Sequence, residues 1–275
     1  MQLLRFFFVR GARVLLAASL GVCLIFSPPA DAAEGAWRVG LGLASFVGPQ
    51  YPGSSSDRFY AYPLPYVSYH GPQFTFDRNR ASVRWGSHWR LGLSADGTPP
   101  VKSSDVTARS GMPDLDATLD IGPDLAYVLS SRPGYPRRLV GLVYRAREAL
   151  GSGFSVYQAG YTGGPYGQLV WGQNPWRYGT SLTLLFGDAR SNGYFFTVAP
   201  TSAAPGRPAY SAPGGYSGAE WTITASRHYQ RAWIGGFLRV SDYDGVAFAA
   251  SPMLKSSITV MAGFAVYGYR PLPGS

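Results

Sequence analysis

Most of this chain alternates apolar residues with polar or small ones at every second position. In the segment 117–130, for example, Leu119 and Ile121 fall on one face, whereas Asp120 and Asp124 fall on the other. Successive side chains point to opposite sides of a β-strand, so a period of two predicts strands with one apolar and one polar face. We find no window with a convincing 3.6-residue period. The chain is therefore predicted to be all-β.

Twelve segments carry this pattern, and they predict a closed antiparallel up-and-down β-barrel of about 12 strands. One of them, 73–85, is irregular because Phe74 and Phe76 share one parity while Val83 and Trp85 share the other. A bulge or turn near Asn79 would explain this switch. The predicted strands are 36–46, 59–70, 73–85, 88–96, 117–130, 138–149, 161–172, 175–187, 192–199, 219–229, 231–242 and 256–269.

Two kinds of β protein alternate in this way. A soluble sandwich turns its apolar faces toward a dry core, whereas a membrane barrel turns them toward lipid and fills its interior with polar and small groups. Strands of about ten residues suit a tilted bilayer crossing, and only 14% of the chain is charged. We therefore favour the transmembrane barrel over the soluble sandwich. Aromatic residues expected at its two membrane interfaces are Trp37, Tyr69, Trp89, Trp176, Trp221, Tyr267 and Tyr269.

The first 32 residues have the plan of a secretory signal peptide. Three arginines lie within residues 1–13, an apolar run follows at 14–26, and Ala30-Asp31-Ala32 resembles a cleavage site. An uncleaved anchor is the alternative, and lipidation at Cys23 is disfavoured because apolar residues follow it. We expect a mature chain of residues 33–275. Since Cys23 is the only cysteine, the mature chain has no disulfide, thiolate metal site or cysteine nucleophile.

The connections predict an orientation. Three long polar ones, 47–58, 200–217 and 243–255, fall outside the cell if both termini are periplasmic. The long connection 97–116 falls on the periplasmic side instead. Either the strand count is wrong by one near 73–96, or this connection is a periplasmic docking element with a mixed-charge surface. Its charged residues are Lys102, Asp105, Arg109, Asp114 and Asp116.

No catalytic, cofactor-binding or metal-binding residue is predicted. Tyr51-Pro52-Gly53-Ser54 is favoured as a turn over an exposed partner epitope, because Pro-Gly presets turn geometry. The pairs Ser87-His88 and Ser226-His228 could indicate a hydrolase. Catalysis would also need a third, orienting group, and neither pair has an evident acidic partner. We therefore expect a protein that is not an enzyme and needs no cofactor.

Arginine outnumbers lysine by 22 to 2, and several arginines share the polar strand face with acids. Fixed guanidinium charges suit a buried, ion-paired interior, so we favour a closed plug over an anion-selective pore. The basic surplus could also contact lipopolysaccharide and outer-membrane lipid, whereas nucleic acid is not expected as a partner. The polar-face residues are Arg38, Arg145, Arg147, Arg177 and Arg239, with Asp120, Asp124 and Glu220.

Several segments, taken in order, resemble the MipA/OmpV family (MltA-interacting protein) of outer-membrane proteins. They depart from it at 97–111 and in the residues that follow Tyr269, where such barrels usually end on an aromatic residue. The matching segments are Trp37–Gly42, Gln50–Ser55, Pro63–Pro65, Leu115–Pro123, Asn192–Val198, Pro208–Tyr210, Gly214–Gly215 and Ser251–Pro252.

The resemblance implies an outer-membrane β-barrel exported through a cleaved signal peptide. For the family's namesake it implies a scaffold that links a lytic transglycosylase to a murein synthase. Other members are described as porin-like or adhesin-like. We therefore expect a non-catalytic scaffold for murein-remodelling enzymes at the cell envelope, with a porin-like or adhesin-like protein as the alternative and a barrel hydrolase as the less favoured one.

Overall fold

The computed structural model describes residues 36–70, 74–77, 80–130 and 135–271, so the predicted signal segment 1–32 lies outside the described residues. Eleven strands of six residues or more form one antiparallel sheet, with a four-residue strand, β3, between two of them. The strands are β1 (Ala36–Pro49), β2 (Asp57–His70), β3 (Phe74–Asp77), β4 (Arg80–Trp85), β5 (Trp89–Thr98), β6 (Ala117–Ser130), β7 (Arg137–Leu150), β8 (Val156–Gln173), β9 (Trp176–Gly187), β10 (Gly215–His228), β11 (Ala232–Asp242) and β12 (Ile258–Pro271).

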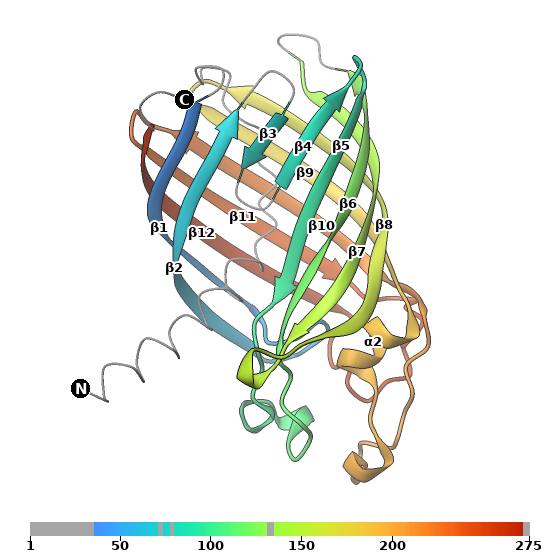
Figure 1. Ribbon diagram of the computed structural model, residues 1–275. Helices are drawn as coiled ribbons and strands as arrows, with labels where there is room; N and C mark the ends of the chain where they lie inside the picture. Colours follow the sequence, from blue (N-terminus) through green and yellow to red (C-terminus); the bar gives the residue numbers. More distant parts are fainter. Residues whose placement is uncertain (1–35, 71–73, 78–79, 131–134, 272–275) are drawn as a thin grey trace, which may run out of the picture.

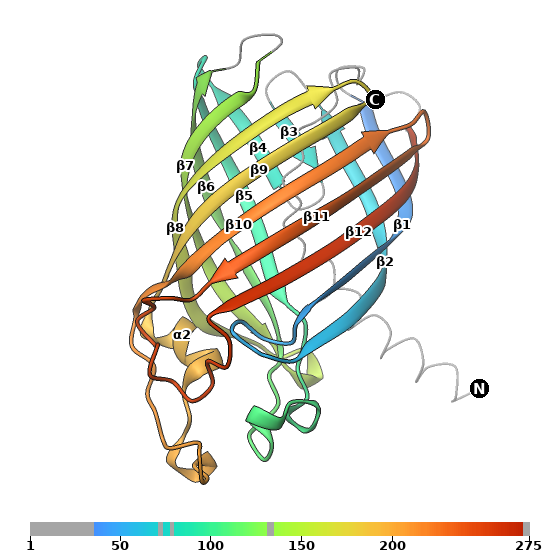
Figure 2. The same ribbon diagram turned by 180° about the vertical axis from the view of Figure 1, so that it is seen from behind.

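The sheet curls around a common interior (Figures 1 and 2). Strands that follow one another along the chain are neighbours in the sheet, and β1 pairs with β12 on one side and β2 on the other. The pairing between β2 and β3 is limited to Ser68–His70 against Thr75–Asp77, and it is the shortest in the sheet's described part. These findings confirm the predicted all-β antiparallel class.

The two faces of the sheet differ as the alternation predicts. Outward positions hold large apolar side chains exposed on the surface, such as Leu41 on β1 and Phe264 on β12. Inward positions hold buried polar groups, such as Thr118, Asp120 and Asp124 on β6. Large aliphatic side chains therefore cover much of the outside of the curled sheet, whereas its interior holds buried charged and polar groups together with clusters of aromatic side chains.

Two of the predicted strands are wrong. The segment 73–85 forms two antiparallel strands, β3 and β4, as its parity switch indicates, and the predicted bulge or turn at Asn79 itself lies outside the described residues. The segment 192–199 forms helix α2 (Ala189–Phe196) instead of a strand. Asp188 caps the helix by accepting a hydrogen bond from the Ser191 amide at 2.7 Å. No helix in the described ranges is long and apolar enough to cross a membrane.

The first of these corrections also changes the predicted orientation of the connection 97–116. Splitting 73–85 adds one change of direction before it, so it emerges at the same end as the other long connections (Figure 1). Of the two alternatives stated for 97–116, a strand count wrong by one near 73–96 is therefore confirmed, and this connection lies at the same end as the other long ones. Long connections gather at one end of the sheet, and short turns and the end of β12 lie at the other, which we call the short-turn end.

The aromatic residues do not all lie where the interface pattern predicts. Trp37 and Trp89 are exposed near the short-turn end, as expected. Tyr267 and Tyr269 instead point into the interior, where they pack against Tyr66. Trp221 is exposed but lies in the middle of β10, and its indole N–H donates to Thr180 at 2.8 Å. The alternation along β12 explains why Tyr267 and Tyr269 point inward, because Phe264 and Val266 occupy its outward face.

Candidate functional site: a capped interior

The long connections fold together into one structure, which we call the loop cap: residues 50–56, 99–116, 188–214 and 243–257. Each of the four segments contributes apolar side chains to a single core that lies beyond the ends of the strands. Phe196 and Phe248 stack within it, with ring centroids 3.8 Å apart. The buried core residues are Tyr51, Val101, Val106, Met112, Leu115, Phe195, Phe196, Val198, Ala212, Tyr243, Val246, Phe248 and Met253.

The predicted turn at Tyr51-Pro52-Gly53-Ser54 is confirmed, since the Ser54 amide donates to the Tyr51 carbonyl at 3.0 Å. Gly53 has φ +71°, a conformation that favours glycine, and a Cβ there would lie 2.5 Å from Leu254. Tyr51 is only 1% exposed, and its hydroxyl donates to the Met253 carbonyl at 2.8 Å. Burial raises the pKa of Tyr51 to about 12. Because Tyr51 is buried, this turn anchors the cap and its tyrosine is not a surface epitope.

The segment 97–116 is folded into the cap rather than extended as a free loop. Arg109 is buried, and its guanidinium donates to the carbonyls of Pro113 at 3.2 Å and Phe195 at 3.4 Å. Burial lowers the pKa of Arg109. Asp114 accepts hydrogen bonds from the amide and hydroxyl of Ser103 at 2.7 and 2.8 Å, and these bonds lower its pKa. The docking role predicted for this segment thus loses its local support.

Beneath the cap, charged side chains connect opposite walls of the interior. Asp96 on β5 lies 3.7 Å from Arg239 on β11, and these strands are six steps apart in the strand order in either direction. Asp96 also lies 3.8 Å from Arg145 on β7, and Arg239 lies 3.8 Å from Glu220 on β10. We call these four residues, together with the pair described next, the ion-pair layer.

Arg147 joins the ion-pair layer to the cap. Its Nε and Nη2 atoms donate to the two carboxylate oxygens of Asp120 at 2.8 and 2.6 Å. Its Nη1 atom donates to the hydroxyl of Ser191 in α2 at 2.8 Å, and its guanidinium lies 5.1 Å from the centre of the Phe195 ring. One arginine therefore holds a strand wall and the cap helix in a fixed relation.

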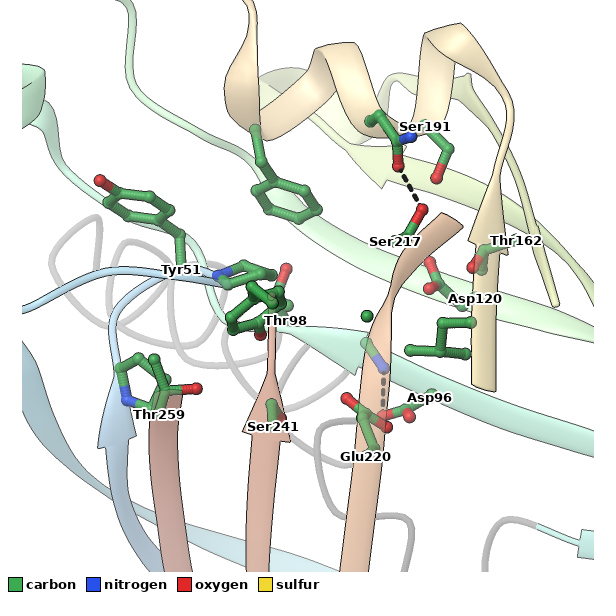
Figure 3. A pocket seen from close by; sticks show the side chains of 18 of the residues that line it. Tyr51, Asp96, Thr98, Asp120, Thr162, Ser191, Ser217, Glu220, Ser241 and Thr259 are labelled. Atoms are coloured by element: carbon green, nitrogen blue, oxygen red, sulfur yellow. Dashed lines mark hydrogen bonds between the residues drawn. The ribbon is translucent and has the colours of Figure 1, made fainter. Parts of the chain in front are cut away.

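A cavity of about 130 Å³ separates the two layers. Figure 3 shows Asp96 and Glu220 on its strand side and Ser191 with Ser217 near α2. Charged groups bound the cavity on one side, and the folded cap bounds it on the other.

The structure brings together part of the predicted polar-face set. Arg145, Arg147, Arg239, Asp120 and Glu220 all belong to the ion-pair layer. Asp124 lies farther along β6 and accepts a hydrogen bond from the hydroxyl of Tyr166. Arg38 and Arg177 lie near the short-turn end, far from the cap. The predicted ion-paired interior is thus present at one level of the barrel wall.

Neither serine–histidine pair lies in the capped interior. Ser87 and His88 are adjacent on the exposed turn between β4 and β5, with the Ser87 hydroxyl 2.6 Å from His88 Nδ1. Ser226 and His228 lie near the short-turn end of β10, where His228 Nδ1 is 3.5 Å from the Tyr269 hydroxyl. Among the described residues, no three His, Cys, Asp or Glu side chains are placed to share a metal ion.

Asp96 is the residue of the layer that the sequence interpretation missed. It ends the predicted strand 88–96, and it shares a parity with Arg90 and Ser94, opposite Leu91 and Leu93. That parity alone places it inside. Its partners could not be found in the same way, because β7 and β11 reach it only through the curl of the whole sheet.

Comparisons with solved structures give distant matches. The toluene transporter TbuX of Ralstonia pickettii is 11% identical with a TM-score of 0.35, covering 86% of this chain and 89% of the other. The toluene transporter TodX of Pseudomonas putida is also 11% identical, with a TM-score of 0.33, covering 86% and 90%. TM-scores below 0.5 do not establish a common fold.

No curated protein matches the sequence. The family described as MltA-interacting protein MipA matches residues 41–270, which include nearly all the strands, the whole loop cap and the ion-pair layer. This match spans most of the chain and confirms the predicted relationship. The chain belongs to the MipA family.

Proposed function

We propose that this chain forms a closed transmembrane β-barrel in the outer membrane and acts there as a non-catalytic interaction protein. The observation that carries the proposal is the division of its two faces. Exposed leucines, valines and phenylalanines cover the outside of the curled sheet, whereas the charged side chains of the ion-pair layer lie inside. In water that arrangement would expose a large apolar surface, and in a bilayer it is the arrangement expected of a barrel.

The connections support an orientation. Outer-membrane barrels have short periplasmic turns and longer extracellular loops, so the loop cap faces outside and the short-turn end faces the periplasm. The lumen is then closed toward the outside by the cap and, beneath it, by the ion-pair layer. A protein built in this way is better suited to hold partners than to conduct ions.

The proposed binding partners come from the description of the family to which the chain belongs. Its name describes a protein that interacts with MltA, and we infer that this chain likewise binds a lytic transglycosylase and, through it, a murein synthase. Such enzymes act in the periplasm, so they would meet the short-turn end. Described arginines gather toward this end. The arginines are Arg38, Arg84, Arg90, Arg137, Arg138, Arg177, Arg227, Arg231 and Arg270.

The test is binding of a purified lytic transglycosylase to the reconstituted barrel. One variant reverses charge at two exposed turn-end arginines, Arg84→Glu and Arg231→Glu, and a matched variant shortens 102–111 in the cap. We expect the first to weaken binding at least tenfold and the second to leave it unchanged. Loss of binding only on shortening the cap would overturn the proposed orientation, and no binding by the wild type would overturn the scaffold role.

An adhesin-like role is the second candidate, and the folded cap favours it. Its four segments form one packed surface beyond the strands, which suits contact with something outside the cell. Attachment of cells to a surface that is lost on shortening 102–111, with transglycosylase binding absent, would favour this role. Turnover of a lipid or glycan abolished by His88→Ala or His228→Ala would instead indicate an enzyme.

A further inference from the structure

An apolar groove of about 530 Å³ lies on the outer wall of the barrel, a volume within the range of about 300–1,000 Å³ that ligand sites occupy. Two outward positions of β8, Pro165 and Gly167, form its floor because they carry little or no side chain. Gly167 pairs with Val140 on β7 and with Leu182 on β9, so branched side chains flank it. The lining residues used here are Leu125, Tyr127, Val140, Leu142, Leu182 and Leu184.

One end of the groove carries a positive charge. Arg138 is exposed and lies two residues before Val140, which places it on the same outward face of β7, about 7 Å nearer the short-turn end. Trp89 and Tyr127 line the groove toward that end, and their rings meet edge to face with centroids 5.0 Å apart. Aromatic residues of this kind are typical of the level where acyl chains meet headgroups.

We propose that this groove and Arg138 form a binding site for one glycerophospholipid of the periplasmic leaflet. An acyl chain lies over Gly167 between β7 and β9, and the guanidinium of Arg138 donates hydrogen bonds to the lipid phosphate. An amphiphile with an apolar chain and an anionic end matches the two parts of the site in order. The inference rests on the proposed insertion of the barrel in a membrane.

Two variants address the two parts of the site. Gly167→Leu fills the floor, and a Cβ at this position would meet no atom within 4 Å, so the barrel wall accommodates it. Gly268→Leu is its control, because Gly268 is exposed on β12 and equally open. Arg138→Gln removes the charge. Its control is Arg270→Gln, which removes an exposed arginine at the short-turn end of β12.

The measurement is native mass spectrometry of each protein titrated with phosphatidylglycerol in detergent, after heat-modifiable gel migration has shown that it folds. We expect one tightly bound lipid for the wild type and both controls. Binding should be about tenfold weaker for Arg138→Gln, as for loss of one charge-assisted contact. It should be similarly weaker for Gly167→Leu, because the new side chain fills the floor of the groove. Equal binding by all five proteins, or equal loss in tests and controls, overturns the site. Flotation with liposomes separates the two proposals: a wild type that fails to insert overturns the membrane barrel, whereas insertion without a bound lipid overturns only this site.

Discussion

Asp96 forms ion pairs with two arginines from different strands, Arg145 on β7 and Arg239 on β11. One substitution at Asp96 therefore tests the contacts that cross the interior. In Asp96→Ala, Arg145 keeps its 2.8 Å bond to Ser94 and Arg239 keeps Glu220 at 3.8 Å, but both lose their shared carboxylate. Removing one partner of a buried ion pair costs about 3–5 kcal/mol. We expect a loss near the lower end of this range in the free energy of unfolding, measured by urea titration in lipid vesicles.

The control for this substitution is Asp244→Ala, since Asp244 is exposed in the cap and takes no part in the layer. A surface change of this kind is expected to alter stability by less than about 0.5 kcal/mol. Equal effects of the two substitutions would show that Asp96 is not held in a network.

Tyr51 gives a pH-dependent prediction for the cap. Burial raises its pKa to about 12, whereas the pKa of a tyrosine in an unfolded chain is about 10. The neutral form is therefore favoured by folding, and its contribution to stability is complete below about pH 10 and is lost as pH rises toward 12. Absorbance at 295 nm should show one tyrosine fewer titrating above pH 11 in Tyr51→Phe than in the wild type. No difference between the two curves would mean that Tyr51 is solvated.

At the scale of elements, helix α2 depends on one carboxylate. Asp188 Oδ1 accepts from the Ser191 amide and also from the Tyr161 amide at 3.2 Å, so it links the helix start to β8. We expect Asp188→Ala to lower stability by about 1 kcal/mol, as for loss of an N-cap. Hydrogen exchange should show faster exchange confined to α2 and its contacts in the cap.

Arg190→Ala is the matched change, because Arg190 is exposed in the first turn of the same helix. It should leave exchange in α2 within the wild-type range. Faster exchange throughout the strands of Asp188→Ala would contradict a local capping role.

The strands could be predicted wherever the two faces of an element meet different surroundings. Leu125 and Asp124 lie on opposite faces of β6 and meet the outside and the interior, so a period of two follows directly. The segment 192–199 was misassigned because Phe195 and Phe196 are both buried in a core made by distant loops. An eight-residue helix stabilised by such contacts carries little periodic signal of its own. The ion pairs could not be predicted either, since Asp96 and Arg239 meet only across the curled sheet.

At the scale of the whole molecule, the loop cap and the ion-pair layer follow one another along the interior, so their effects on conductance can be tested separately. We expect the reconstituted wild type to show no steady conductance in planar bilayers. Shortening 102–111 opens part of the cap but leaves the ion-pair layer, so it should also remain closed. Combining the shortened cap with Asp96→Ala should produce measurable steady current. Large, stable channels in the wild type would contradict this view and favour a porin.

The hydrogen bond from Tyr51 to Met253 joins residues 202 positions apart. Tyr51 follows the first strand, whereas Met253 precedes the last, so the cap is completed only after the final hairpin has been synthesised and brought to the first. Contacts this distant in sequence form late in folding, because the loop they close spans about three quarters of the chain. A nascent chain that still lacks β12 therefore cannot complete the loop cap, and closure of the cap marks the completion of its assembly.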